Sequence, residues 1–117
     1  MQNGTYMKRE RELIRGAGPV AVLQLLQRGE MYGYEIAETL SRRTSGVLAM
    51  GQSTLYPLLY SLESKGLVES RWAEADSGRK RRYYKLTEQG EAFLDQRRIE
   101  WRELFAAMAG LGVVEAT

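Results

Sequence analysis

The sequence predicts a mainly α (α+β) fold in which short helices, one β-hairpin and a long final helix form a single domain. Leucines within residues 20–65 recur at the 3.6-residue period of a helix, whereas residues 68–86 alternate with the two-residue period of a strand. With 117 residues and 44% hydrophobic content, the chain is long enough for one modest core. No apolar run approaches the roughly 18 residues of a membrane span and no secretory pattern is visible, so a cytoplasmic protein is expected.

The first helices are predicted from apolar runs and their breakers. A helix that contains the apolar residues 20–28 is expected to begin at Pro19, with Gly18 as its cap, and residues 8–16 are expected to form a separate helical turn before that break. A second helix is expected from about residue 33 to residue 44, and a loop or short strand follows it. Its apolar stripe consists of Gly33, Ile36, Ala37 and Leu40.

The third helix, residues 52–65, presents two different faces. Its leucines share one side, at positions i, i+3, i+4 and i+7: Leu55, Leu58, Leu59 and Leu62. The opposite side carries polar and tyrosyl side chains: Gln52, Ser53, Tyr56 and Tyr60. Pro57 lacks an N–H, so regular hydrogen bonding must begin close to Ser53 or the helix kinks there. Exposed tyrosines beside small polar residues indicate a contact surface.

A hairpin and a long helix follow. Residues 67–75 and 80–86 alternate as strands around the turn sequence at residues 76–79. Alternation places Arg79, Arg81 and Tyr83 on one face of the second strand and Lys80, Arg82 and Tyr84 on the other. One of the two tyrosines is expected in the core and the other at the surface. Thr87 is a predicted N-cap for a helix over residues 88–109.

The final helix carries a heptad-like apolar seam, which predicts packing against another helix. The seam residues are Leu94, Trp101, Leu104, Met108 and Leu111. We therefore expect residues 1–86 to bind a partner molecule and residues 87–117 to form a dimerisation helix and tail, within one compact unit.

The charge distribution and the composition limit the classes of function that the chain could have. The net charge is only +2, yet residues 71–85 hold six basic and two acidic side chains, which favours a polyanionic partner. The chain contains neither histidine nor cysteine, so the usual metal ligands and the commonest general base and nucleophile pairs are missing. No enzyme activity, cofactor or metal is expected; an enzyme using carboxylates or Lys80 has no paired motif to support it.

This order of elements is that of a winged helix-turn-helix, whose third helix enters the DNA major groove while the hairpin, or wing, lies along the phosphates. The candidate base-reading residues are Gln52, Ser53 and Thr54, with Tyr56 and Tyr60 reaching bases or phosphates. The candidate phosphate ligands are Arg79, Lys80, Arg81 and Arg82, with Lys8, Arg9, Arg11 and Arg15 as further candidates.

Each of these features has a simpler alternative. The polar residues at the start of the third helix are also good helix caps, and the basic run could be a solvated turn. The same fold could bind protein or RNA instead of duplex DNA, since fold does not fix function.

Three sequence segments together resemble the PadR family of bacterial transcriptional regulators: MYGYEIAETL, STLYPLLYSLESKGLV and SGRKRRYYKLTEQG, followed by EWRELFAAM. The resemblance spans residues 10–110. It implies a homodimer joined through a single C-terminal helix per protomer, which binds a pseudo-palindromic operator, usually as a repressor. Pro19 departs from the family pattern, in which the first helix is unbroken.

The resemblance also suggests a role for Trp101. In some members a tryptophan at the matching place stacks flat aromatic effectors against its symmetry mate, and Phe105 and Met108 would line the same space. The alternative is a tryptophan that only packs in the dimer core. The expected partners are double-stranded DNA, a second copy of the chain and a candidate small aromatic effector, with no membrane.

Overall fold

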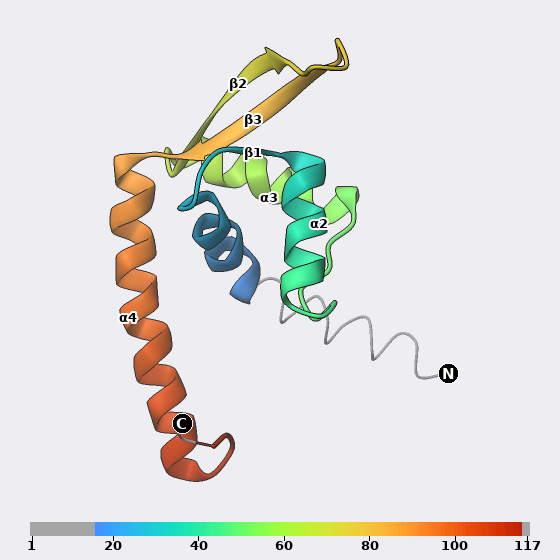
Figure 1. Ribbon diagram of the computed structural model, residues 1–117. Coiled ribbons are helices and arrows are strands. Elements are labelled where there is room, and N and C mark those ends of the chain that lie inside the picture. Colours follow the sequence, from blue (N-terminus) through green and yellow to red (C-terminus); the bar gives the residue numbers. More distant parts are fainter. Residues whose placement is uncertain (1–15, 116–117) are drawn as a thin grey trace.

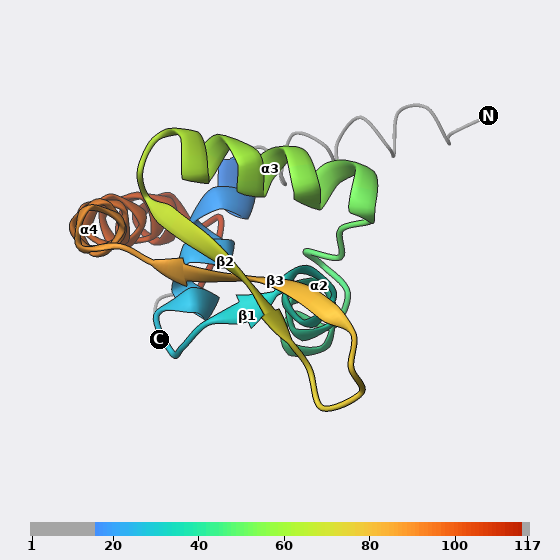
Figure 2. The same ribbon diagram turned by 90° about the horizontal axis from the view of Figure 1, so that it is seen from above.

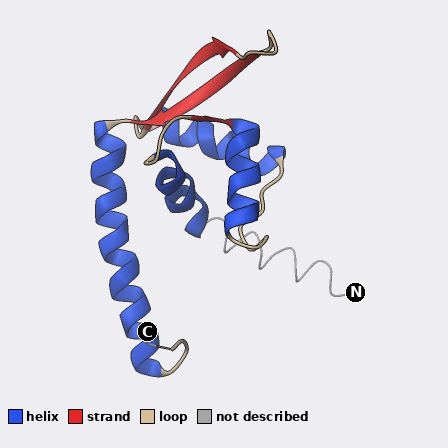
Figure 3. Ribbon diagram, viewed as in Figure 1, coloured by secondary structure: helices blue, strands red, loops and turns tan. Residues whose placement is uncertain are grey.

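The computed structural model describes residues 16–115. Residues 16–26 are helical, and six elements follow: β1 (Met31–Tyr32), α2 (Gly33–Arg43), α3 (Gln52–Ser64), β2 (Val68–Glu74), β3 (Lys80–Leu86) and α4 (Glu88–Leu111). The sheet lies across one end of the helices (Figures 1 and 3). The predicted mainly α (α+β), winged-helix architecture is confirmed. The candidate basic residues Lys8, Arg9, Arg11 and Arg15 lie outside the described residues.

The predicted break at Gly18 and Pro19 is wrong. Helical conformation already includes Gly16 and continues through Pro19 to residue 26, with Gly29 in the following turn at φ 150°. The fixed φ of proline is itself helical, so a glycine–proline pair does not compel a helix to start there. The described part of this helix is therefore unbroken, as the resemblance implied.

The helices and the sheet meet in one core. Residues 16–26 contribute four fully or nearly buried side chains, α2 contributes Ile36 and Leu40, and α3 contributes Leu55, Leu59 and Leu62. Met50, Leu67, Val68, Tyr84 and Leu94 complete the cluster from the loops, the strands and α4. The predicted leucine face of α3 is therefore confirmed as its packing face.

The sheet has three antiparallel strands in the order β1-β3-β2. We call the β2–β3 hairpin, residues 68–86, the wing. β3 has the predicted bounds, and β2 is one residue shorter at each end than the predicted strand of residues 67–75. β1 was not predicted, because two residues are too few to show a period. It pairs Met31 with Tyr84 and Tyr32 with Tyr83, and so ties the wing to the start of α2.

α4 begins with the predicted cap and is packed only over its first turns. Thr87 Oγ1 accepts a hydrogen bond from the Gly90 N–H (2.9 Å) and donates one to the Gly66 carbonyl (2.7 Å). A Cβ on Gly90 would stand 2.0 Å from the Leu67 carbonyl oxygen, so only glycine permits this approach of the helix to the strand. The helix is roughly 36 Å long, and Figure 1 shows its C-terminal half extending beyond the other elements.

Among residues 16–115, no helix combines the length and the apolar character that crossing a membrane would require.

Candidate nucleic-acid interface

The first turn of α3 presents its polar side chains to solvent. Its N-cap is Gly51, which has no side chain, and regular hydrogen bonding begins at the Gly51 carbonyl with the N–H of Leu55 (3.0 Å). Helix capping from the N-cap position therefore does not explain Gln52, Ser53 or Thr54, all of which are exposed. Pro57 lies inside the helix, after regular bonding has begun.

Tyr56 and Tyr60 differ in their surroundings. The Tyr56 phenol packs across the start of α2, where its Oη would stand 2.7 Å from a Cβ placed on Gly33. This glycine therefore makes room for the ring. Tyr60 is 75% exposed. Tyr56 is thus held by the protein while keeping one edge accessible, whereas Tyr60 projects freely.

The two faces of the wing carry different residues, as the alternation predicted. Cross-strand pairs show which side chains share a face, because directly opposed residues point the same way. Trp72 opposes Arg82 and Glu74 opposes Lys80, whereas Ala73 opposes Arg81. Tyr84 is buried and Tyr83 is half-buried, which confirms one core and one surface tyrosine. Burial raises the pKa of the Tyr84 hydroxyl, an effect that the nearby Arg82 charge partly offsets.

A groove of about 670 Å³ lies between the wing and the first turns of α2 and α3. It brings together six of the nine predicted DNA-binding residues: Gln52, Tyr56, Arg79, Lys80, Arg81 and Arg82. Ser53, Thr54 and Tyr60 do not line it. Viewed from above, the wing passes across the helices and its turn projects beyond α2 (Figure 2). Cations, aromatic faces and one side-chain amide therefore converge on a single concave surface.

Sequence reasoning missed three aromatic residues of this groove. Trp72, Tyr34 and Tyr32 also line it, and Trp72 and Tyr34 are 66% and 64% exposed. The Arg81 guanidinium lies 4.3 Å from the centre of the Tyr32 ring. Position in the alternating strand could have identified Trp72 as a residue on the face of Lys80 and Arg82. No local pattern links Tyr32 or Tyr34 to the wing, because β1 brings them there.

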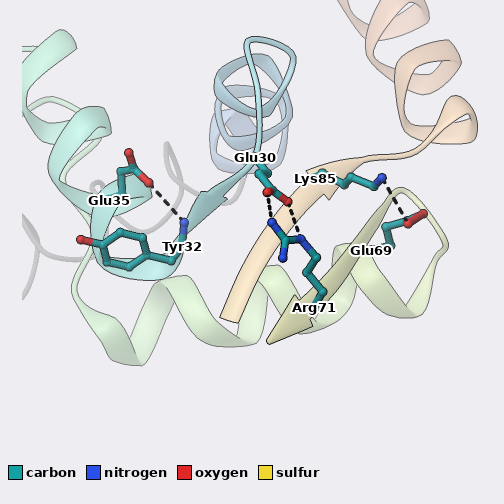
Figure 4. Close-up of polar contacts among 6 residues, drawn as sticks. All are labelled: Glu30, Tyr32, Glu35, Glu69, Arg71 and Lys85. Carbon is teal, nitrogen blue, oxygen red and sulfur yellow. Dashed lines mark hydrogen bonds and ion pairs between the residues drawn. The ribbon is translucent and has the colours of Figure 1, made fainter. Parts of the chain in front are cut away.

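The outer face of the wing is fastened to the segment before β1. Arg71 donates from both Nε (3.1 Å) and Nη2 to the Glu30 carboxylate, and its guanidinium lies 5.6 Å from the Tyr83 ring centre. The hydrogen bonds from Arg71 lower the pKa of Glu30. Figure 4 shows this pair together with Glu69 and Lys85, whose charged atoms are 3.8 Å apart.

The basic residues of the wing therefore fall into two groups. Arg71, Arg82 and Lys85 form ion pairs with carboxylates of this chain. Within the described residues, Arg79, Lys80 and Arg81 have no such partner. The second group lies towards the turn of the wing, where a polyanion could be contacted without displacing a carboxylate.

The predicted seam of α4 is divided. Leu94 is fully buried in the core cluster of its own chain, so its assignment to a dimer seam is wrong. The remaining seam residues and Phe105 are exposed along one side of the helix, and we call them the α4 stripe: Trp101, Leu104, Phe105, Met108 and Leu111.

The three residues of the candidate effector pocket are not enclosed together. Trp101 lines a cavity of about 260 Å³ at the junction of residues 16–20, the end of α3 and α4. Phe105 and Met108 do not line that cavity and are 50% and 38% exposed farther along the helix. Within one chain Trp101 therefore lines a small cavity and is also partly exposed to solvent.

Known proteins resemble this chain over most of its length. Residues 22–96 match the Transcriptional regulator PadR-like family. Transcriptional regulator Rv3488 of Mycobacterium tuberculosis is 35% identical over 100 residues, which are 86% of this chain and 90% of the relative. A PadR family transcriptional regulator from Eggerthella lenta superposes with a TM-score of 0.77 at 31% identity, covering 93% of each chain.

A second solved structure agrees with this assignment. The PadR-like transcriptional regulator from Bacillus cereus superposes with a TM-score of 0.78 at 25% identity, covering 89% of this chain and 99% of that one. The matching segment contains the third helix and the basic wing on which the resemblance was first based. The chain belongs to the PadR-like family of transcriptional regulators, which bind DNA.

Proposed function

We propose that the chain is a ligand-responsive repressor that binds a pseudo-palindromic operator as a homodimer. The observation that carries the DNA-binding part is the groove, whose lining includes Gln52 at the start of α3 together with Arg79, Lys80 and Arg81 of the wing. An α-helix fits the major groove of B-DNA, and a glutamine amide pairs with both hydrogen-bonding atoms of adenine. Lysine and arginine beside it suit the adjacent phosphates.

Within this proposal eight of the nine predicted residues, all except Arg82, have separate tasks. Gln52, Ser53 and Thr54 read base edges, and Tyr56 and Tyr60 contact bases or the backbone. Arg79, Lys80 and Arg81 bind phosphates, and Trp72 adds an exposed aromatic contact beside them. Such a division predicts that wing variants weaken binding to every duplex, whereas variants in the first turn of α3 weaken only operator binding.

The α4 stripe supports the homodimer. Five exposed apolar side chains repeat at helical spacing over the C-terminal half of α4. A second copy of the same helix would cover them, and a two-fold axis would place two copies of α3 on half-sites about one helical turn apart.

The ligand response is proposed at Trp101, Phe105 and Met108. A flat aromatic effector would gain apolar contact with these side chains at the dimer axis. It would regulate binding only if it prefers one spacing of the two recognition helices over another. Titration of the protein with flat aromatic compounds, followed by tryptophan fluorescence and by release of DNA, tests this step.

The experiment for the whole proposal is fluorescence anisotropy of a labelled duplex from upstream of the gene, with an unrelated duplex as control, from low to high salt. A preference for the upstream duplex that persists at physiological salt is expected. Sedimentation equilibrium should give the mass of two chains. Equal, weak binding to both duplexes would contradict operator recognition, and a salt-independent affinity would point to a protein partner instead.

A further inference from the structure

Arg82 differs from the other predicted phosphate ligands because three elements of the chain hold its guanidinium. Its Nε donates to Ser70 Oγ on β2 (2.9 Å), and its Nη2 donates to Glu63 Oε1 on α3 (3.2 Å). Ser70 Oγ in turn donates to Glu63 Oε2 (2.6 Å). The three side chains form a closed network that joins β3, β2 and α3.

Aromatic rings restrict the same guanidinium. Its central carbon lies 6.0 Å from the ring centre of Trp72 and 5.8 Å from that of Tyr84. Because Tyr84 is buried, it cannot follow an arginine that swings outward. A guanidinium that moved to a DNA phosphate would lose these contacts and two directed hydrogen-bond acceptors at once.

The position of Glu63 in α3 also favours a nearby cation. It lies in the last turn of α3, where the helix dipole disfavours a carboxylate, and that turn contains no basic residue. Arg82 is the cation that the structure places against it. Removing Arg82 to solvent or to DNA would leave Glu63 half-buried beside like-signed backbone carbonyls.

We propose that Arg82 is a positioning residue, which fastens the wing to the C-terminal end of α3 and does not bind DNA phosphate. It thereby sets where Lys80 and Arg79 stand relative to Gln52 at the other end of the same helix. The inference rests on the proposed DNA binding. Because Arg82 and Glu63 together are neutral, they release no counterion on binding, so the number of phosphate contacts made by the wing falls by one.

The test compares salt dependence on a duplex of random sequence, where only phosphate contacts matter. The variant is Glu63→Gln/Arg82→Met, which removes both charges and leaves the net charge of the chain unchanged. We expect its affinity to fall about fivefold at every salt concentration, with the slope of log Kd against log salt unchanged. The matched control is Lys80→Met, on the same face of the same strand, which should lower that slope by about 0.9.

A charge-conserving variant separates the two roles independently. Lysine binds phosphate as a point charge but cannot reproduce the arginine fork to Ser70 and Glu63. Arg82→Lys should therefore bind about as weakly as the double variant. Wild-type affinity for Arg82→Lys, or a slope lowered by about one in the double variant, would identify Arg82 as a phosphate ligand and overturn the inference.

A measurement without DNA keeps this inference distinct from the proposed function. The chain has two tryptophans, so Trp101→Phe leaves Trp72 as the only one. In that background Glu63→Gln and Ser70→Ala should each shift the Trp72 emission, because the guanidinium beside its ring is released. Unchanged emission in both would overturn the inference. Failure of the wild-type chain to bind any duplex, with the emission shifts present, would contradict only the proposed function.

Discussion

The aromatic side chains of the groove and those of α4 differ in what surrounds them. In the groove, Tyr32 lies under Arg81, and Tyr56 packs on Gly33. On α4, Trp101 and Phe105 are 42% and 50% exposed at the surface of a helix that leaves the body of the chain.

The difference is between a surface whose side chains are held within one chain and a surface whose apolar side chains are left exposed. Within one chain, Tyr32 and Tyr56 of the groove are already held by a cation and by neighbouring backbone. In the α4 stripe, Trp101 lines a small cavity of its own chain, but the side chains farther along the helix are exposed. Their apolar surface is removed from water only when another molecule covers it. Preorganisation favours tight and specific binding in the groove, whereas exposed apolar area favours association of α4.

The largest expected effect comes from charging the α4 stripe. Phe105→Glu would place an unpaired carboxylate in the proposed dimer interface, which costs about 4 kcal/mol, or roughly a thousandfold in the dimer dissociation constant. Sedimentation equilibrium measures it. The control is Ile99→Glu, which is similarly exposed on α4 at 45% but lies off the stripe. Equal dissociation by both variants would contradict the assignment of the interface to the stripe.

The next effect distinguishes the two ends of α4. Gly90→Ala would press a methyl group against the Leu67 carbonyl and should lower the free energy of unfolding by about 3 kcal/mol. Gly110→Ala in the same helix meets no atom within 4 Å and should raise it by about 0.5–1 kcal/mol through helix propensity. Thermal or urea unfolding checks both. A harmless Gly90→Ala would mean that α4 does not approach the Leu67 backbone so closely.

The groove is tested by removing its one glutamine amide. Gln52→Ala should cost about 1–3 kcal/mol of binding free energy on the operator and little on random DNA, because a base contact carries sequence information. Anisotropy titrations on the two duplexes measure the difference. Lys80→Ala is the control and should weaken both alike. Equal losses on both duplexes for Gln52→Ala would remove its base-reading role.

The smallest effect concerns the outer face of the wing. Arg71 lowers the pKa of Glu30 from its ordinary value of 4.5, so the pair stabilises the fold above that pH, and this contribution is lost as the pH falls through the lowered pKa. Glu30→Gln should therefore flatten the pH dependence of the melting temperature below about pH 5. Arg71→Gln should flatten it equally, and the double variant should add nothing. An unchanged profile in Glu30→Gln would show that the pair does not stabilise the wing.

Local periodicity was a good guide to elements that pack along one face. The leucines of α3, the bounds of the wing and the Thr87 cap follow from side-chain spacing alone, because a helix and a strand repeat at fixed periods. The basic run was found for the same reason. Segments whose structure depends on contacts with other parts of the chain were predicted less well. Pro19 did not begin a helix, and β1 is too short to show a period.

The sequence by itself therefore determined the winged helix-turn-helix order of elements, the polar first turn of α3 and the family. Tertiary structure decided which cations of the wing are available. Arg81 and Arg82 are indistinguishable as letters in a basic run, yet one lies on Tyr32 and the other is bound by Glu63. It also decided that Leu94 belongs to the core while Trp101 is exposed. The physical reason is that ion pairing and burial depend on residues far away in the chain, whose approach no local period encodes.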